Sequence, residues 1–226
     1  MKLSELSNTS LRILTAAVMI GIVVIAVLLE KYGIPFLSIK HFHAIRWLGV
    51  LIVAVCIFET IRCIKNADAE IVHKNILPII LFVCLLGTML FSVYSLGTHS
   101  LLMLRLLMII VGADVGGWLS GKVFGGDKLW ENISAHKTWA GQIGGVICGT
   151  IMSVLYYKWF GGYLQNAVFI GISIALLSQY GDLTASFIKR RFGIKDFSNI
   201  LPGHGGMLDR FDGWIYVLPL IWLITK

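Results

Sequence analysis

Long apolar runs recur along this chain, with only short polar connections between them. They lie near residues 11–29, 44–63, 76–96, 101–124, 139–160, 166–190 and 213–225. A helix needs about 20 mostly apolar residues to cross a bilayer core, and all but the last run approach that length. Because lipid offers no hydrogen-bond partner, each run must satisfy its backbone groups internally, as an α-helix does. We therefore expect an all-α, polytopic membrane protein with about seven transmembrane helices.

The composition agrees with this class. Hydrophobic residues make up 57% of the 226 residues and charged residues 14%, whereas soluble domains carry about 25% charged residues. The formal net charge of +7 is expected to face anionic lipid headgroups and not nucleic acid. The four cysteines lie in apolar runs without CxxC spacing, so we expect neither a zinc site nor a disulfide framework.

Lys and Arg are shared unevenly between the two sides that seven spans would create. The side with the N-terminus and the loops 125–138 and 190–212 carries 13 of the 19 basic residues, and the other side carries 6. The positive-inside rule places the richer side in the cytoplasm. Since no internal repeat is visible, we expect one membrane-embedded domain over 1–226, with N-terminal helices over 1–100 and the polar motifs over 101–226.

The densest polar stretch of the chain covers residues 186–212. It combines basic residues, a Gly-rich turn around His204, and the acids Asp209 and Asp212. Basic side chains and glycine N–H groups suit a polyphosphate, while closely spaced carboxylates suit a hard cation such as Mg²⁺. On one turn of a helix Asp209 and Asp212 would face the same way. Alternatively, both acids only stabilise the N-terminus of the last helix, and His204 only caps a turn.

Further polar residues interrupt the apolar segments upstream. Asp114 and Asp182 lie inside predicted spans, where an unpaired carboxylate is costly. Ser134, Lys137 and Thr138 precede the predicted helix 139–160, and helix N-termini favour anions such as a triphosphate. Two structural alternatives stay open. Asp114 would hydrogen-bond another helix, and the 134–138 segment would form an ordinary N-cap with a lysine that reaches the membrane surface.

In order and spacing, residues 186–212 resemble the signature of the phosphatidate cytidylyltransferases, also called CDP-diacylglycerol synthases. The matching elements are Ser186, Lys189-Arg190, Lys195-Asp196, His204-Gly205-Gly206 and Asp209-Arg210-Phe211-Asp212. Residues 114–125 and 134–141 resemble two further motifs of that family. This chain departs from the family pattern at Lys122, where Arg is usual, and at Ala140 and Ala185, where an acid is common.

The resemblance implies transfer of CMP from CTP to phosphatidate, giving CDP-diacylglycerol and pyrophosphate for phospholipid biosynthesis. It implies Mg²⁺ held by Asp182, Asp209 and Asp114, a second cation beside it, and a homodimer. Catalytic roles would fall to Lys189, Arg190, His204 and Asp212. Substrate binding would fall to Lys122, Ser134, Lys137, Thr138, Ser186, Lys195, Gly205, Gly206 and Arg210. The expected setting is a bacterial inner membrane, with the site facing the cytoplasm that supplies CTP.

Three alternatives remain. A related enzyme would transfer CMP from CTP to another lipid phosphate, or would be a kinase that uses CTP to phosphorylate a lipid. An ion-coupled transporter would use Asp114 and Asp182 as a proton or cation relay, although transporters often show repeated halves and none is visible here. The departures at Lys122, Ala140 and Ala185 also fit a weak or inactive relative.

Overall fold

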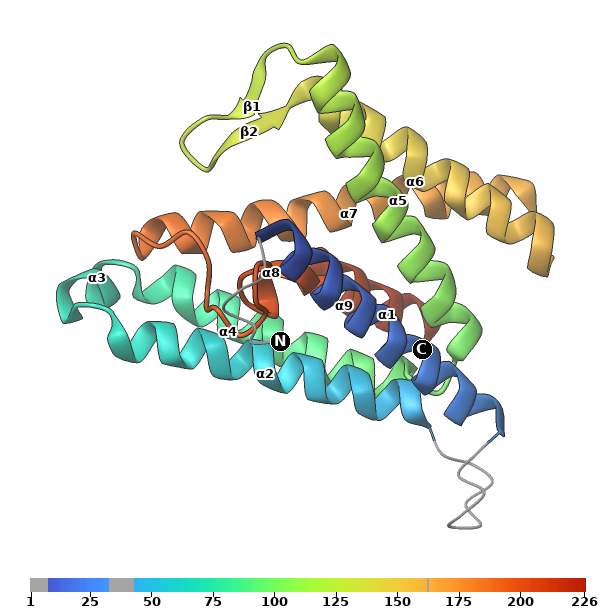
Figure 1. The fold of residues 1–226 in the computed structure, drawn as a ribbon, viewed down its shortest axis with the longest axis horizontal. Helices are drawn as coiled ribbons and strands as arrows, with labels where there is room; N and C mark the ends of the chain where they lie inside the picture. Colours follow the sequence, from blue (N-terminus) through green and yellow to red (C-terminus); the bar gives the residue numbers. More distant parts are fainter. Residues whose placement is uncertain (1–7, 33–42, 162) are drawn as a thin grey trace. The chain divides into compact units, whose positions relative to one another are not determined.

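The computed structural model describes residues 8–32, 43–161 and 163–226 (Figure 1). Within these residues the chain is almost entirely helical, which confirms the predicted all-α class apart from one short hairpin. The elements in chain order are α1 (Asn8–Tyr32), α2 (Ala44–Asn66), α3 (Ala69–Lys74), α4 (Ile76–Leu96), α5 (Ser100–Phe124), β1 (Lys128–Trp130), β2 (Ser134–Thr138), α6 (Trp139–Phe160), α7 (Leu164–Arg191), α8 (Leu208–Phe211) and α9 (Trp214–Thr225).

Among the described helices, five are long and apolar enough to cross a membrane, namely α2, α4, α5, α6 and α7. The bounds of α4 and α6 coincide with the apolar runs 76–96 and 139–160. Two shorter apolar helices, Ala17–Glu30 within α1 and Trp214–Thr225, correspond to the first and last predicted runs. The helices are those of an integral membrane protein, and the total of seven spans stays a prediction.

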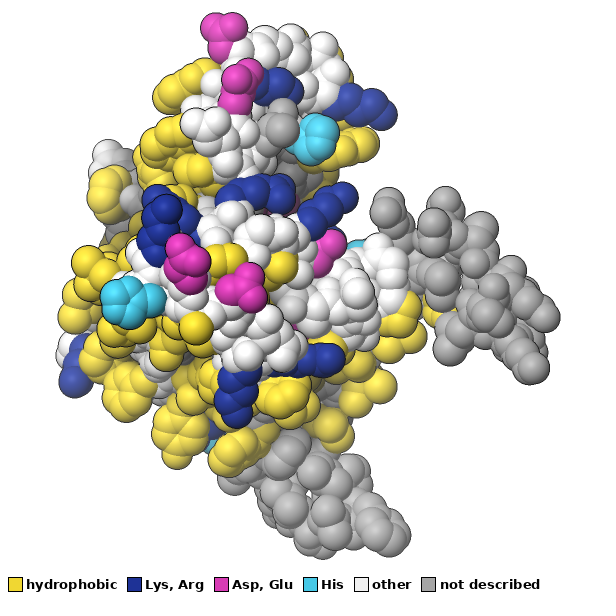
Figure 2. Space-filling view, turned by 90° about the vertical axis from the view of Figure 1, so that its left-hand side faces the viewer, with side chains coloured by type: hydrophobic (Ala, Val, Ile, Leu, Met, Phe, Trp, Pro, Cys, Tyr) yellow, Lys and Arg dark blue, Asp and Glu magenta, His cyan; other side chains and the backbone are white. Residues whose placement is uncertain are grey.

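Large apolar side chains are exposed on the surfaces of these helices. Leu51 of α2, Leu77 of α4, Ile147 of α6 and Phe169 of α7 each expose more than half of their area. Figure 2 shows hydrophobic side chains over large parts of the visible surface. Such exposure is unusual for a soluble monomer, but lipid tails are themselves apolar. The surface therefore agrees with helices that face lipid.

The chain divides into two compact units. The first combines Met1–Ser100 with Arg191–Phe211, and the second combines Leu101–Arg190 with Asp212–Lys226. Most of the polar stretch 186–212 therefore packs with the N-terminal helices, although it follows α7 directly in the sequence.

The first unit is built on α2 and α4, which pack along each other, with α1 against α2 (Figure 1). Gly49 allows this approach, because a Cβ there would lie 2.5 Å from Cγ2 of Val93. The ring of Phe82 in α4 stacks on that of Phe197, with centroids 6.1 Å apart. Leu208 is fully buried. Apolar contacts thus hold the segment 191–211 within the unit.

The second unit contains the hairpin and helices α5, α6, α7 and α9. Small residues form the contact between α5 and α6, since a Cβ at Gly116 would lie 2.3 Å from the Cβ of Cys148. Gly141, Gly145 and Gly149 recur at four-residue intervals on α6, and all three are buried. Small residues at this spacing let transmembrane helices approach closely.

Replacing Gly116 by Val should destabilise the second unit. Besides Cys148, the new side chain would meet the carbonyl oxygen of Gly144, 2.9 Å from the Cβ position. Overpacking of this kind costs about 1–3 kcal/mol. Thermal unfolding in detergent measures the loss. Gly87→Val is the control, because nothing lies within 4 Å of a Cβ at that position of α4. Equal melting temperatures for the two variants would contradict the packing described here.

The polar loop predicted over 125–138 contains the antiparallel hairpin of β1 and β2, whose register aligns Lys128 with Thr138. Gly125 and Gly126 have φ angles of +59° and +90°, a region that glycine enters without a steric penalty. They end α5 and turn the chain toward β1. A three-residue strand is too short to show an alternating pattern, which is why the sequence did not indicate it.

Candidate functional site

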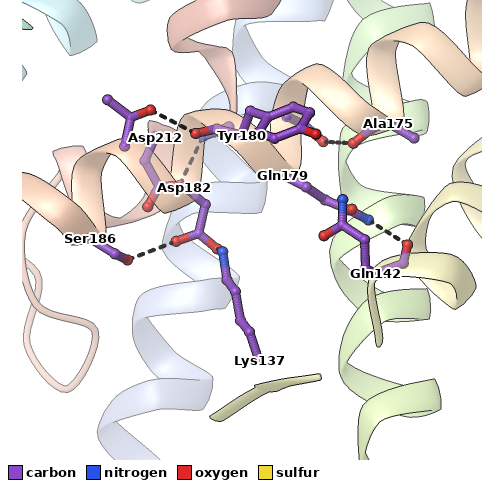
Figure 3. A network of polar contacts seen from close by, with 11 residues as sticks. Lys137, Gln142, Ala175, Gln179, Tyr180, Asp182, Ser186 and Asp212 are labelled. Atoms are coloured by element: carbon purple, nitrogen blue, oxygen red, sulfur yellow. Dashed lines mark hydrogen bonds and ion pairs between the residues drawn. The ribbon is translucent and has the colours of Figure 1, made fainter. Parts of the chain in front are cut away.

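Asp182 of α7 lies in a polar cluster of the second unit (Figure 3). The Nζ atom of Lys137, from β2, lies 2.6 Å from Asp182 Oδ2. Ser186, one turn further along α7, donates from Oγ to Asp182 Oδ1 over 3.2 Å. The side chains of Lys137 and Asp182 remain 26% and 37% exposed, although the Nζ atom of Lys137 is itself buried beside the carboxylate. The structure thus brings together three of the predicted site residues.

Asp212, which follows α8, lies within electrostatic range of this cluster. Desolvation raises the pKa of Asp212 well above its usual value. The negative charges of Asp182 and Asp114 raise this pKa further, while the positive charges of Lys189 and Lys137 oppose the shift. Two acids and two lysines of the second unit therefore act on Asp212, and they come from α5, β2 and α7.

Gly181 sets how closely the backbone of Asp212 approaches α7. A Cβ at Gly181 would lie 2.3 Å from the carbonyl oxygen of Asp212 and 3.3 Å from Cα of Gly213. No side chain fits there unless this backbone moves. The Gly-Asp pair at 181–182 therefore combines a close backbone contact with a carboxylate at the next position.

Two predicted residues near the hairpin have structural contacts. Thr138 caps α6, its Oγ1 accepting a hydrogen bond from the N–H of Gly141 over 3.1 Å, so the N-cap alternative describes this residue. Arg190, near the end of α7, donates from Nε to the carbonyl oxygen of Ile133 over 3.3 Å. Ser134 begins β2. These contacts tie the hairpin to α6 and α7.

Two predicted lysines sit on helices of the same unit. Lys189 of α7 is buried, at 9% exposure, and its charge acts on Asp212. Lys122 is exposed in the last turn of α5, with Nζ 5.1 Å from the ring centroid of Trp118. This distance is that of a cation–π contact.

A second polar cluster lies in the first unit, where the carboxylate of Glu59 in α2 binds the segment before α8. Glu59 is fully buried, at 0% exposure. Its Oε1 accepts hydrogen bonds from Ser198 Oγ over 2.5 Å and from the N–H of Met207 over 2.9 Å. Its Oε2 accepts from the N–H of Leu208 over 2.9 Å. One helix carboxylate thus satisfies a side chain and two consecutive backbone groups.

Asp209, the first acid of the Asp-Arg-Phe-Asp element, binds the same segment. Its Oδ2 accepts hydrogen bonds from the N–H groups of Phe197 and Gly206, over 3.0 and 2.9 Å. A Cβ at Gly206 would lie 3.0 Å from that oxygen and 3.0 Å from each carboxylate oxygen of Glu59. Gly206 is therefore enclosed by two acids, and a side chain there would fit only if their carboxylates moved by a few tenths of an ångström.

The turn at 203–206 is closed by Arg210. Its Nε and Nη2 donate to the carbonyl oxygen of His204 over 3.0 and 2.7 Å. Gly203 and Gly205 have φ angles of +76° and +86°, which favour glycine. The Nδ1 atom of His204 is buried and has no hydrogen-bond partner among the described residues. Nδ1 of His204 thus takes no part in the hydrogen bonds described for this turn.

A pocket of roughly 680 Å³ lies beside this segment in the first unit. Its polar lining includes Arg62, Asn66, Asp196, Ser198 and Asn199. A volume of this size falls within the range of about 300–1,000 Å³ usual for small-molecule sites. Lys195, which precedes Asp196, is exposed.

The prediction that Asp209 and Asp212 share a helical turn is wrong. Helix α8 ends at Phe211, and Asp212 belongs to the second unit while Asp209 belongs to the first. The metal set of Asp114, Asp182 and Asp209 likewise draws on both units and stays a prediction. Among the residues that the structure describes, no group of three or more His, Cys, Asp or Glu side chains is arranged to hold a metal ion.

Sequence reasoning missed Glu59, although a signal for it was present. Glu59 lies inside the apolar run 44–63, and an acid within a membrane span is a reason to expect a function. The same reasoning selected Asp114 and Asp182. Ser198, by contrast, carries no signal, because a single serine in a polar segment is unremarkable.

Comparison with known proteins agrees with the signature. The model of the cytidylyltransferase family matches residues 33–226. A phosphatidate cytidylyltransferase of Rickettsia bellii is 30% identical over 230 residues, covering 97% of this chain and 91% of that protein. Phosphatidate cytidylyltransferases of Staphylococcus aureus and Staphylococcus haemolyticus are 43% and 40% identical, over 56% and 58% of this chain.

The chain spans about half the length of the staphylococcal relatives, at 49% and 50%. The family match, in contrast, extends from before α2 to the end of α9. It includes both polar clusters described above, with Glu59, Lys137, Asp182 and Asp209. The chain therefore belongs to the cytidylyltransferase family.

Proposed function

We propose that the protein transfers CMP from CTP to phosphatidate, giving CDP-diacylglycerol and pyrophosphate. The observation that carries the proposal is the cluster of Lys137, Asp182 and Ser186, in which the side chain of Asp182 stays 37% exposed. Family membership and the names of the relatives support the same reaction.

The reaction needs charge stabilisation more than covalent help. A phosphate oxygen of the lipid forms a bond to the α-phosphorus of CTP, and the bond from that phosphorus to the bridging oxygen breaks as pyrophosphate leaves. Negative charge accumulates on the phosphate oxygens in the transition state. Fixed positive groups stabilise such charge where water is excluded. Lys137 and Lys189 are the cations of the second unit that we assign to this role.

The carboxylates of the second unit suit a divalent cation. Asp182 and Asp114 both raise the pKa of Asp212 even though Lys189 and Lys137 oppose the shift, so a cation bound beside these acids would offset negative charge that the lysines leave uncompensated. We propose that Asp182 and Asp114 hold Mg²⁺, which would neutralise substrate phosphates. The contribution of Asp209, a second cation and a homodimer remain predictions from the sequence.

A direct assay tests the function. Purified protein in detergent is incubated with phosphatidate, CTP labelled in its cytosine, and Mg²⁺ or Mn²⁺. We expect a labelled, lipid-soluble product that forms only when the divalent cation is present. An unlabelled lipid phosphate of another class serves as the competing substrate. Absence of product across both cation titrations would contradict the proposal.

The site is expected to face the cytoplasm of a bacterial inner membrane, and labelling can test this. Lys128 lies in the hairpin and Lys158 in the last turn of α6. Helix α6 has 22 residues, which at about 1.5 Å each span roughly the hydrocarbon core. In a cysteine-free background, Lys128→Cys should react only from the cytoplasmic side and Lys158→Cys only from the other. The reverse pattern would overturn the orientation.

A further inference from the structure

We infer that Glu59 is a positioning residue that holds the turn bearing His204, Gly205, Gly206 and Asp209 in its working geometry. The inference rests on the proposed function, because those four residues belong to the cytidylyltransferase signature. Glu59 lies in α2 and outside that signature.

The bonding of Glu59 is directed at one short segment. Its two carboxylate oxygens accept three hydrogen bonds, from Ser198, Met207 and Leu208. Met207 and Leu208 directly precede Asp209 in the chain. Fixing their N–H groups therefore fixes the backbone from which the Asp209 side chain projects.

Complete burial makes this bonding necessary. A buried carboxylate is strongly disfavoured unless hydrogen bonds or a cation replace its lost hydration. Glu59 is 0% exposed, and three donors of the segment supply that replacement. The segment and the carboxylate thus depend on each other. If Glu59 cannot bind the segment, both its oxygens and the N–H groups of Met207 and Leu208 lose their partners.

Gly206 shows how tightly the turn sits between two acids. The position of a Cβ at Gly206 lies 3.0 Å from Asp209 Oδ2 and 3.0 Å from both oxygens of Glu59. Asp209 binds the N–H of Gly206 itself, while Glu59 binds the next two N–H groups. Three consecutive backbone groups are therefore oriented by carboxylates. A shift of Glu59 would move the turn relative to Asp209.

Replacing the acid at position 59 by its amide removes one of the two hydrogen-bond acceptors. Glutamine has one carbonyl oxygen, and its NH₂ group would face either the N–H of Leu208 or that of Met207, which are both donors. Asp209 differs, because one oxygen accepts the bonds from both Phe197 and Gly206. An asparagine at 209 can keep both bonds through its carbonyl oxygen. Glu59→Gln therefore removes a hydrogen-bond acceptor as well as a charge, whereas Asp209→Asn removes a charge and can keep the two hydrogen bonds.

The test compares Glu59→Gln, Glu59→Asp and the control Glu70→Gln, which makes the same chemical change at an exposed position of α3. We expect kcat to fall about 100-fold in Glu59→Gln, since a displacement near 1 Å is enough for such a loss. The KM for CTP should change much less. Glu59→Asp keeps both oxygens and should recover part of kcat, while Glu70→Gln should match the unaltered protein.

Hydrogen–deuterium exchange of the peptide covering 203–211 gives a readout that does not need activity. The N–H groups of Met207 and Leu208 should exchange faster in the Glu59→Gln variant than in the unaltered protein. In the Asp209→Asn variant, the same two groups should exchange at nearly the rate of the unaltered protein. Unchanged exchange in Glu59→Gln, or a kcat within about threefold of the unaltered protein, would overturn the inference.

Two further outcomes are also decisive. If the unaltered protein makes no CDP-diacylglycerol, the proposed function fails and the exchange measurement alone decides the role of Glu59. If Glu59→Gln does not fold, Ser198→Ala replaces it, because this change removes one of the three donors to Glu59. A smaller increase in exchange over 203–211 would support the inference, and no increase would refute it.

Discussion

Asp182→Asn is expected to remove nearly all turnover while the protein still inserts and purifies. Asparagine keeps an oxygen for the Ser186 hydroxyl but loses the charge that attracts Lys137. We expect kcat to fall roughly 100- to 1,000-fold, the range seen when one group that stabilises transition-state charge is removed. Steady-state kinetics with labelled CTP measure the fall, and raising Mg²⁺ is expected to restore part of it.

A double variant distinguishes this role from a simple ion pair. Lys137 is itself assigned to the reaction, so the double variant is compared with Lys137→Met alone. If Asp182 only neutralises Lys137, the two should be equally active, because no unpaired charge would remain in either. If Asp182 binds a cation, the double variant should be less active than Lys137→Met. Near-normal turnover in Asp182→Asn, or a double variant as active as Lys137→Met, would remove Asp182 from the metal site.

Asp209→Asn extends the same test to the first unit. If Asp182 and Asp209 act on one ion, each single variant should lose nearly all activity, and the double variant should be little worse than either. Asparagine can keep the hydrogen bonds from Phe197 and Gly206, so a loss of activity would not come from breaking these two bonds. Near-normal turnover in Asp209→Asn would exclude Asp209 from the metal site.

Gly181→Ala is the second substitution with a large expected effect. Its Cβ would meet the carbonyl oxygen of Asp212 at 2.3 Å, and this atom belongs to the backbone, so it cannot turn away as a flexible side chain can. The turn at 212–213, which precedes α9, must shift, and with it the carboxylate of Asp212. A displacement of about 1 Å near reacting groups lowers the rate about 100-fold.

The matched control is Gly87→Ala, whose Cβ would have nothing within 4 Å. The measurement is kcat/KM together with the melting temperature, so that a loss of activity can be separated from a loss of fold. If Gly181→Ala has the same activity as Gly87→Ala, the close contact between α7 and Asp212 does not position the site.

The helices could be predicted from the sequence because their cause is local. In lipid each apolar run must form its own hydrogen bonds, so the length of the run determines the helix. The bounds of α4 and α6 coincide with the runs for this reason. The hairpin and the short helix α3 were not predicted, since three to six residues carry too little pattern.

The candidate site was predicted in part. Motif spacing selected Lys137, Asp182 and Ser186, and the structure joins them in one cluster. Spacing also suggested that Asp209 and Asp212 face the same way on one helix. The end of α8 at Phe211 separates them, because the chain turns at 212–213 before α9 begins.

By itself the sequence determined the class of the protein, an all-α membrane protein, and its family signature, because both depend on residues close together along the chain. The tertiary structure alone decided what holds that signature. Glu59 is 148 residues from Met207 and 149 from Leu208, and no local pattern connects residues so far apart. Only folding, which packs 191–211 against α2, brings the buried carboxylate within hydrogen-bond distance of the turn.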